Sequence, residues 1–178
     1  MPKKKIKFGI LGLGRVIEKR LVDVFKHEVT DAKVSAVFDN NLKKNKKFSK
    51  IFNCKFSNTF KDFINTKLDI IYIATESGNH FKNISDCFLA KKSVIVEKPP
   101  VLKVDQLIKL NNIAKKYKLK FYVVYQNRLN KSVLYLKKNF KKLFNEKIAF
   151  VNLKLLWCRE QKYYSDWHGS WKMDGGVI

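Results

Sequence analysis

Two glycines that lie two positions apart, Gly12 and Gly14, separate a short apolar run from a stretch whose apolar residues recur at helical spacing. Glycine lets a backbone turn tightly and approach a phosphate closely, and the first N–H groups of a helix attract anions. This order therefore predicts a site for the pyrophosphate of a dinucleotide. The candidate contacts are Gly12, Gly14, Arg15 and Val16. An ordinary strand–turn–helix is the alternative, because Ile17 holds the third position of the G-x-G-x-x-G pattern.

Asp39 follows a second apolar run, at 33–38, and lies 25 residues beyond Gly14. That is close to the spacing at which an acidic side chain meets the adenosine ribose of a bound dinucleotide. A carboxylate there accepts hydrogen bonds from both ribose hydroxyls and repels a 2′-phosphate, so it favours NAD over NADP. An aspartate in a turn or at a helix N-cap is the alternative. Lys43 and Lys44 keep NADP open as the second choice.

Three later apolar runs, at 69–74, 93–96 and 120–125, also end in polar residues. The polar residues that we select are Thr75, His80, Glu97, Lys98, Gln126 and Arg128. Apolar runs that alternate with amphipathic helical patterns predict an α/β protein with a Rossmann-type, doubly wound parallel sheet and helices on both faces. Ligands of such sheets bind outside the carboxyl ends of the strands, so we expect all the selected residues at one edge.

The remaining residues do not continue the alternation. A helix is expected at 131–144 and a strand at 148–157, followed by a tail rich in tyrosine and tryptophan. We therefore predict an NAD-binding domain at 1–126, and at 127–178 the first strand and loop of an incomplete α+β substrate domain. The sequence stops after Gly175-Gly176-Val177-Ile178, where a further helix is expected to begin.

The chain is strongly basic, with a formal net charge of +23 that comes from 34 lysines and 4 arginines. The lysines are spread over almost every polar stretch. Proteins that read bases favour arginine, whose fork matches guanine and phosphate. We attribute the excess of lysine, asparagine, isoleucine and phenylalanine to an AT-biased coding sequence, and we expect no specific nucleic-acid partner.

Three cysteines, at positions 54, 87 and 158, lie in apolar contexts without C-x-x-C spacing. They are typical of core thiols in a reducing compartment, so we expect no metal and no disulfide framework. The basic start of the chain is followed by an apolar run that is too short for an export signal or a membrane span. A cytoplasmic location follows as the prediction.

Taken in order, these features resemble the Gfo/Idh/MocA oxidoreductase family. The resemblance is carried by the glycine turn, Asp39, the turn from Thr75 to His80, Gln126-Asn127-Arg128 and above all Glu97-Lys98-Pro99. The later segment, from Trp157 to Gly176, is similar to the branch that oxidises the 3-hydroxyl of UDP-N-acetylglucosaminuronic acid and related sugars. Two departures are Ile17, where the family has a small residue, and Glu76, where it usually has proline.

The resemblance implies an NAD-dependent dehydrogenase that acts on a sugar or nucleotide sugar. Lys98 would be the catalytic residue and touch the substrate hydroxyl, and Arg128 would bind an anionic substrate. Thr75, His80, Glu97 and Gln126 would border the cofactor, with Glu97 also able to orient Lys98. The alternatives are that Lys98 is an ordinary surface lysine, that Glu97 forms a structural ion pair and that His80 merely begins a helix. Arg159, Trp167 and His168 are expected either at the substrate or in loop packing.

In the family the proton-accepting histidine lies beyond the position of Gly176. We therefore expect these 178 residues to bind NAD weakly and to turn over little substrate, and we expect the full-length form to be a homo-oligomer. A non-catalytic NAD-binding regulatory protein of the same fold is the alternative function.

Overall fold

The computed structural model describes residues 5–144, 150, 152, 154 and 156–175. The chain divides into two compact units. The first contains residues 1–124 together with 169–178, and the second contains residues 125–168. The predicted domain boundary, between residues 126 and 127, stays a prediction.

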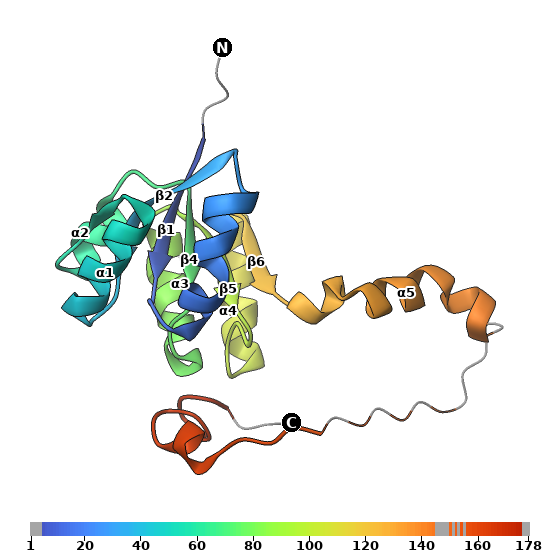
Figure 1. Cartoon of the computed structure of the whole chain (residues 1–178). Helices are drawn as coiled ribbons and strands as arrows, with labels where there is room; N and C mark the ends of the chain where they lie inside the picture. Colours follow the sequence, from blue (N-terminus) through green and yellow to red (C-terminus); the bar gives the residue numbers. More distant parts are fainter. Residues whose placement is uncertain (1–4, 145–149, 151, 153, 155, 176–178) are drawn as a thin grey trace. The chain divides into compact units, whose positions relative to one another are not determined.

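The first unit is built on a six-stranded parallel sheet (Figure 1). Its strands are β1 (Ile6–Leu11), β2 (Ala32–Phe38), β3 (Lys55–Phe56), β4 (Ile70–Ile73), β5 (Ser93–Glu97) and β6 (Phe121–Val124). Their spatial order is β3-β2-β1-β4-β5-β6, so the direction of winding reverses between β1 and β4. This is the doubly wound Rossmann arrangement, and the predicted fold class is confirmed.

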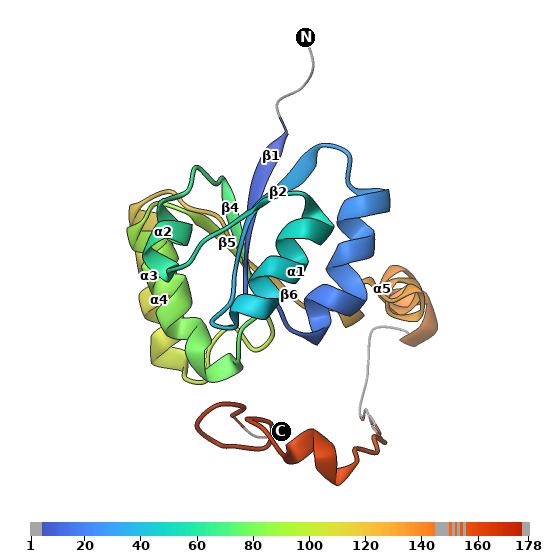
Figure 2. The same cartoon turned by 60° about the vertical axis from the view of Figure 1, so that its left-hand side comes forward.

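Helices cover both faces of this sheet, as Figure 2 shows. One face carries α2 (Phe60–Asn65), α3 (His80–Leu89) and α4 (Val104–Lys116), and the short 3-10 turn η3 (Ser77–Asn79) leads into α3. The other face carries α1 (Leu42–Phe52) and the helix over residues 15–28. The latter includes two stretches with π-helical hydrogen bonding, η1 (Ile17–Leu21) and η2 (Val24–Glu28).

Side-chain caps explain where two of the helices begin. The side chain of Asn41 accepts hydrogen bonds from the Lys43 and Lys44 N–H groups, at 2.9 and 3.3 Å, and so caps α1. Thr59 caps α2 in the same way, accepting from the Asp62 N–H at 3.1 Å.

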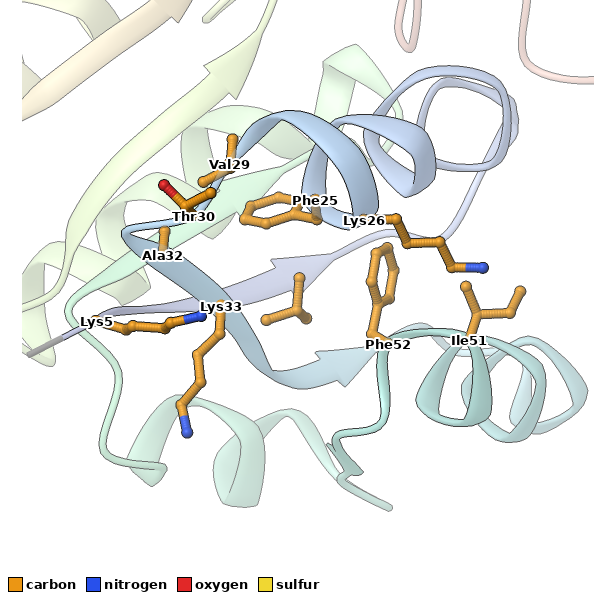
Figure 3. Close-up of a pocket in the computed structure, with 10 residues that line it drawn as sticks. Lys5, Phe25, Lys26, Val29, Thr30, Ala32, Lys33, Ile51 and Phe52 are labelled. Carbon is orange, nitrogen blue, oxygen red and sulfur yellow. The ribbon is translucent and has the colours of Figure 1, made fainter. Parts of the chain in front are cut away.

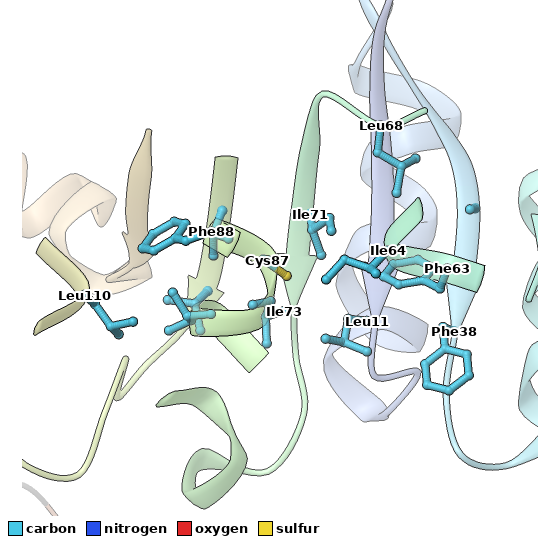
Figure 4. Close-up of a cluster of buried hydrophobic side chains, with 14 of the residues drawn as sticks. Leu11, Phe38, Phe63, Ile64, Leu68, Ile71, Ile73, Cys87, Phe88 and Leu110 are labelled. Atoms are coloured by element: carbon cyan, nitrogen blue, oxygen red, sulfur yellow. The ribbon is translucent and has the colours of Figure 1, made fainter. Parts of the chain in front are cut away.

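Two apolar cores hold the helices to the sheet. Figure 4 shows the first, in which Phe63 of α2 and Phe88 of α3 pack with Ile71 and Ile73 of β4. The second core joins Ile17 and Phe48 to the opposite face of the sheet. Because β1 and β4 are buried on both faces, their sequences are nearly continuous apolar runs rather than alternating ones.

The second unit contains η4 (Gln126–Leu129), α5 (Lys131–Phe144) and η5 (Gln161–Tyr164). The bounds of α5 are those that the sequence predicts. The strand expected at 148–157 falls partly on residues outside the described set, at 148, 149, 151, 153 and 155. The described residues of that stretch belong to no helix or strand.

Candidate functional site

Gly12 lies in a turn that only glycine accommodates without strain. Its φ is +87°, and an added Cβ would lie 2.7 Å from the carbonyl carbon and oxygen of Ala74. Its N–H donates to the Phe38 carbonyl at 2.9 Å. The glycine therefore lets the end of β1 touch the ends of both neighbouring strands, β2 and β4.

Gly14 is different, because a Cβ added there would meet no atom within 4 Å. The space beside it is open, and it lies at the start of the helix over residues 15–28. Arg15 and Val16, in the first turn of that helix, are exposed. The N–H groups of a first helical turn have no partner within the helix and suit a phosphate. An open space beside such N–H groups fits the pyrophosphate of a dinucleotide.

Ile17 does not disrupt this turn, although the family pattern has a small residue there. Its side chain is fully buried in the second core. The helix that carries it has π-helical hydrogen bonding from this residue onward. The bulk of Ile17 is accommodated in the core and leaves the glycine turn open.

Asp39 links the end of β2 to the glycine turn. One carboxylate oxygen accepts from the Leu13 N–H at 2.8 Å, and the other accepts from the Asn41 N–H at 2.8 Å. The Lys44 ammonium lies 3.7 Å from the carboxylate. Each carboxylate oxygen can accept more than one hydrogen bond, so Asp39 retains acceptor capacity for a ribose hydroxyl beside the glycine turn.

The backbone of Asp39 is held by a residue that the sequence analysis missed. The Asn45 side chain accepts from the Asp39 N–H at 2.7 Å and donates to the Asp39 carbonyl at 2.8 Å. Asn45 is buried in the first turns of α1, although Lys46 and Lys47, which follow it, are exposed. Its signal in the sequence was weak, because asparagine is common throughout this chain.

The turn after β4 is fixed from inside by α3. The Thr75 hydroxyl accepts from the Asn83 side-chain amide at 2.8 Å. The His80 ring is 1% exposed, with Nε2 3.0 Å from the Thr75 carbonyl and Nδ1 2.7 Å from the Pro99 carbonyl. Burial lowers the pKa of His80, although both carbonyls favour the charged ring, so we assign a neutral ring at pH 7. A neutral imidazole donates one hydrogen bond, and we assign it to the shorter contact, with Pro99.

The end of β5 presents Glu97 and Lys98. Glu97 is half-buried, and one of its carboxylate oxygens accepts from the Tyr72 hydroxyl at 2.5 Å. Lys98 is exposed, and the peptide bond that joins it to Pro99 is cis. The charged end of Lys98 is therefore available to a ligand at the strand ends.

Part of the C-terminal tail lies at the same edge of the first unit. The Gly78 N–H donates to the Met173 carbonyl at 2.8 Å, and a Cβ on Gly78 would lie 2.9 Å from the Met173 Cα. At Gly175, where φ is +82°, an added Cβ would lie 2.6 Å from the Leu102 side chain. The close approach of the Met173 backbone leaves no room for a side chain at position 78, which explains the glycine there.

Gln126 and Arg128 belong to the second unit, in η4. Both are exposed, and the Arg128 guanidinium lies 4.8 Å from the centre of the Tyr125 ring. In the same unit, Trp167 stacks on His168 at 3.9 Å between ring centres, and Asp166 pairs with the His168 ring. Roles for these residues at a cofactor or substrate stay predictions.

A pocket of about 340 Å³ lies at the other end of the sheet, beside the amino ends of β1 and β2. Figure 3 shows Phe25 and Phe52 in its wall, together with Lys5, Lys26 and Lys33. It is built from none of the candidate site residues.

Within residues 5–144 and the described part of the tail, no group of three or more metal-ligating side chains occurs. In that same part of the chain, no helix has the length and apolar character needed to cross a membrane.

One edge of the first unit thus gathers most of the residues that the sequence selected. The backbone of Gly12 lies close to the backbone of Thr75. The His80 ring contacts the Thr75 carbonyl on one side and the Pro99 carbonyl, in the Glu97-Lys98-Pro99 turn, on the other. The sequence analysis missed Asn45, Asn83 and Tyr72, which hold these residues from beneath. Tyr72 carried the clearest signal, as the one residue with a polar group in the apolar run IIYIA at 70–74.

The sequence matches a model of the Gfo/Idh/MocA family, described as an oxidoreductase family with an NAD-binding Rossmann fold, over residues 6–125. A comparison with curated proteins finds no match. Among solved structures, the chain is similar to the WlbA dehydrogenase of Chromobacterium violaceum, solved with NADH and UDP-GlcNAcA. The TM-score is 0.89 at 28% identity, over 98% of this chain and 51% of that one.

Two further structures extend this likeness. The WlbA dehydrogenase of Bordetella pertussis has a TM-score of 0.89 at 24% identity, over 98% of this chain and 53% of that one, and at this identity supports the fold alone. The scyllo-inositol dehydrogenase of Lactobacillus casei, solved with NAD(H) and scyllo-inositol, has a TM-score of 0.70 at 26% identity, over 78% of this chain and 42% of that one. The chain therefore spans about half the length of these relatives.

Proposed function

Because the chain belongs to the Gfo/Idh/MocA oxidoreductase family, we propose that it forms the cofactor half of an NAD-dependent dehydrogenase. The reaction would transfer a hydride between a secondary alcohol of a sugar or nucleotide sugar and nicotinamide. The observation that carries this proposal is the continuous row of contacts from the open glycine turn to the Glu97-Lys98-Pro99 turn at one edge of the sheet.

In this proposal each half of the cofactor has its own residues. The first turn of the helix over 15–28 binds the pyrophosphate, and Asp39 accepts hydrogen bonds from the adenosine ribose. Thr75, His80 and Glu97 form the part of the edge that borders the nicotinamide half. His80 does so from inside, because its neutral ring donates to the Pro99 carbonyl and its other nitrogen lies 3.0 Å from the Thr75 carbonyl.

The chemistry of the protein rests on Lys98. With NAD bound, oxidation of a secondary alcohol would move a hydride from carbon to nicotinamide and a proton from the hydroxyl to a base, which in the family is a histidine beyond the position of Gly176. The Lys98 ammonium donates a hydrogen bond to the substrate oxygen and stabilises the negative charge that develops there as the proton leaves. The exposed position of Lys98 at the end of β5 leaves its three donor N–H bonds available for this role.

A nucleotide sugar is the substrate class that we favour. It is supported by the likeness to the Chromobacterium WlbA structure, which extends over almost the whole chain, whereas the inositol dehydrogenase is matched over a smaller part. Arg128 is proposed to bind the anionic part of such a substrate. A cytoplasmic location and a homo-oligomeric full-length form complete the proposal.

Titration of the 178-residue chain with NADH, followed by the fluorescence of the reduced nicotinamide, tests the cofactor half of the proposal. We expect saturable binding that is tighter for NADH than for NADPH. The absence of saturable binding would overturn the proposed function. Absorbance at the NADH band, with NAD and UDP-GlcNAcA present, is expected to show little turnover, because the chain spans about half of its relatives.

Ligand-observed NMR tests the substrate half with the same protein. In the presence of NAD, we expect UDP-GlcNAcA signals to show saturation transfer and scyllo-inositol signals to show little. The Lys98→Ala variant should lose most of this transfer while it keeps NADH binding. Lys103→Ala, which removes another exposed lysine five residues further on, is the matched control and should behave like the parent chain.

A further inference from the structure

Tyr72 lies in the interior of the sheet but carries a polar hydroxyl. It occupies the third position of β4, between Ile10 of β1 and Ile95 of β5, and is 7% exposed. A buried tyrosine hydroxyl needs a hydrogen-bond partner. That partner is the Glu97 carboxylate at 2.5 Å, a residue 25 positions further along the chain.

The direction of this hydrogen bond is set by electrostatics. Burial raises the pKa of Tyr72, and the neighbouring Glu97 carboxylate raises it further. The hydroxyl therefore stays protonated and acts as the donor, and the Glu97 oxygen accepts. A short O–H···O⁻ bond of this kind is stronger than a bond between neutral groups and restricts the carboxylate to one orientation.

The restriction falls at the point where the strand meets the proposed ligand edge. Glu97 is the last residue of β5, it pairs with Val124 of β6, and it lies on the same face as Ile95, two residues earlier. One of its oxygens is engaged by Tyr72, and the other can accept a hydrogen bond from a ligand. The exposed Lys98 follows directly.

We infer, on the premise of the proposed function, that Tyr72 is a positioning residue for the cofactor. It holds the Glu97 carboxylate at the end of β5 so that the second oxygen accepts a hydrogen bond from a hydroxyl of the nicotinamide ribose. Tyr72 acts only through Glu97, since its own hydroxyl is buried beneath the strand end. A purely structural role would instead satisfy the hydroxyl and add stability, without any effect on cofactor affinity beyond that of Glu97.

A double-mutant cycle separates these two roles. The proteins are the parent chain, Tyr72→Phe, Glu97→Ala and the double variant, and each is measured for its NADH dissociation constant and its urea unfolding curve. We expect Tyr72→Phe to weaken NADH binding about three- to tenfold, the size of one ordinary net hydrogen bond, because the Glu97 carboxylate is still present and has lost only its fixed orientation. In the Glu97→Ala background, where no side-chain oxygen is left to position, the same change should leave NADH affinity unaltered. Tyr122→Phe is the matched control, because Tyr122 lies on β6 and is 53% exposed.

Each outcome has a definite meaning. Parent-like NADH affinity in Tyr72→Phe, or an equal loss in both backgrounds, would overturn the positioning role. So would full NADH affinity in Glu97→Ala, which tests the role even if Tyr72→Phe fails to fold. A parent chain that does not bind NADH at all would instead overturn the proposed function, and the positioning role with it.

Discussion

The Nδ1 atom of His80 lies 2.7 Å from the carbonyl oxygen of Pro99, so a buried ring at the start of α3 contacts the residue that follows Lys98. Its other nitrogen lies 3.0 Å from the Thr75 carbonyl. One side chain thus joins the turn after β4 to the turn after β5. These two turns border the proposed nicotinamide site, and their separation depends on this ring.

His80 should make the stability of the chain depend on pH. Burial lowers its folded-state pKa, so the unfolded chain binds a proton more readily than the folded chain. The stabilisation is therefore complete above the unfolded-state pKa, about 6.5, and is lost as the pH falls below it. Between pH 7.5 and 5.5 we therefore expect the free energy of unfolding, from urea curves, to fall, by on the order of 1 kcal/mol at most.

A variant pair checks that His80 is the source of this dependence. His80→Gln removes the titrating ring and should unfold with nearly the same free energy at both pH values. His27→Gln is the matched control, because His27 is exposed, and it should keep the pH dependence of the parent chain. A His80→Gln variant with the parent's pH dependence would contradict the assignment.

Gly12 and Gly14 should respond differently to the same substitution. Gly12→Ala places a Cβ 2.7 Å from the Ala74 backbone at a positive φ, so it should lower both the free energy of unfolding, by about 1–3 kcal/mol, and NADH affinity. Gly14→Ala meets open space, so it should unfold like the parent chain. Its methyl group would occupy the proposed phosphate site, and we expect NADH affinity to fall about tenfold or more.

Urea unfolding and NADH fluorescence on both glycine variants give the comparison. The informative result is the separation of the two measurements in Gly14→Ala, with stability kept and affinity lost. Unaltered NADH affinity in that variant would place the pyrophosphate elsewhere.

Much of the fold was open to prediction because its signals are local. The run DIIYIA and the amphipathic pattern at 104–117 define a buried strand and a covering helix without reference to any other residue. The shared edge followed as well, since the carboxyl ends of parallel strands necessarily meet there. Asp39, Thr75 and Lys98 could therefore be assigned to one edge before their contacts were known.

The contacts beneath that edge could not be predicted in the same way. The Tyr72–Glu97 bond depends on the register of β4 against β5, in which Tyr72 pairs with Ile95. The small residue at position 78 depends on Met173, whose backbone approaches it from almost a hundred residues away. Neither relationship leaves a periodic pattern in the sequence, because each joins single residues from distant segments.

Asp39 should determine the choice between NADH and NADPH. Asp39→Asn removes the charge that repels a 2′-phosphate and leaves Lys44 nearby, 3.7 Å from the carboxylate in the parent chain. We expect the ratio of NADPH to NADH affinity to rise about tenfold, measured by fluorescence titration. Asp31→Asn changes the same charge at the opposite end of β2 and should leave the ratio unaltered. An equal shift in both variants would mean that net charge alone sets the preference.

The three cysteines should differ sharply in reactivity. Burial raises the pKa of Cys54 to about 11 and that of Cys87 to about 12, whereas the Cys158 residue is exposed. Since the thiolate is the reactive form, a disulfide reagent at pH 8 should modify one thiol rapidly in the folded chain and three in denaturant.

Absorbance of the released thiol counts the modified residues and gives the rates. Cys158→Ser should remove the rapid phase and leave the two slow thiols, whose reaction then reports the opening of the first unit. Cys54 packs against the second core and Cys87 lies within the first, so each thiol reports on one face of the sheet. Rapid modification of Cys87 in the folded chain would contradict the packing of α3 on β4, and with it the support that α3 gives to Thr75 and Pro99.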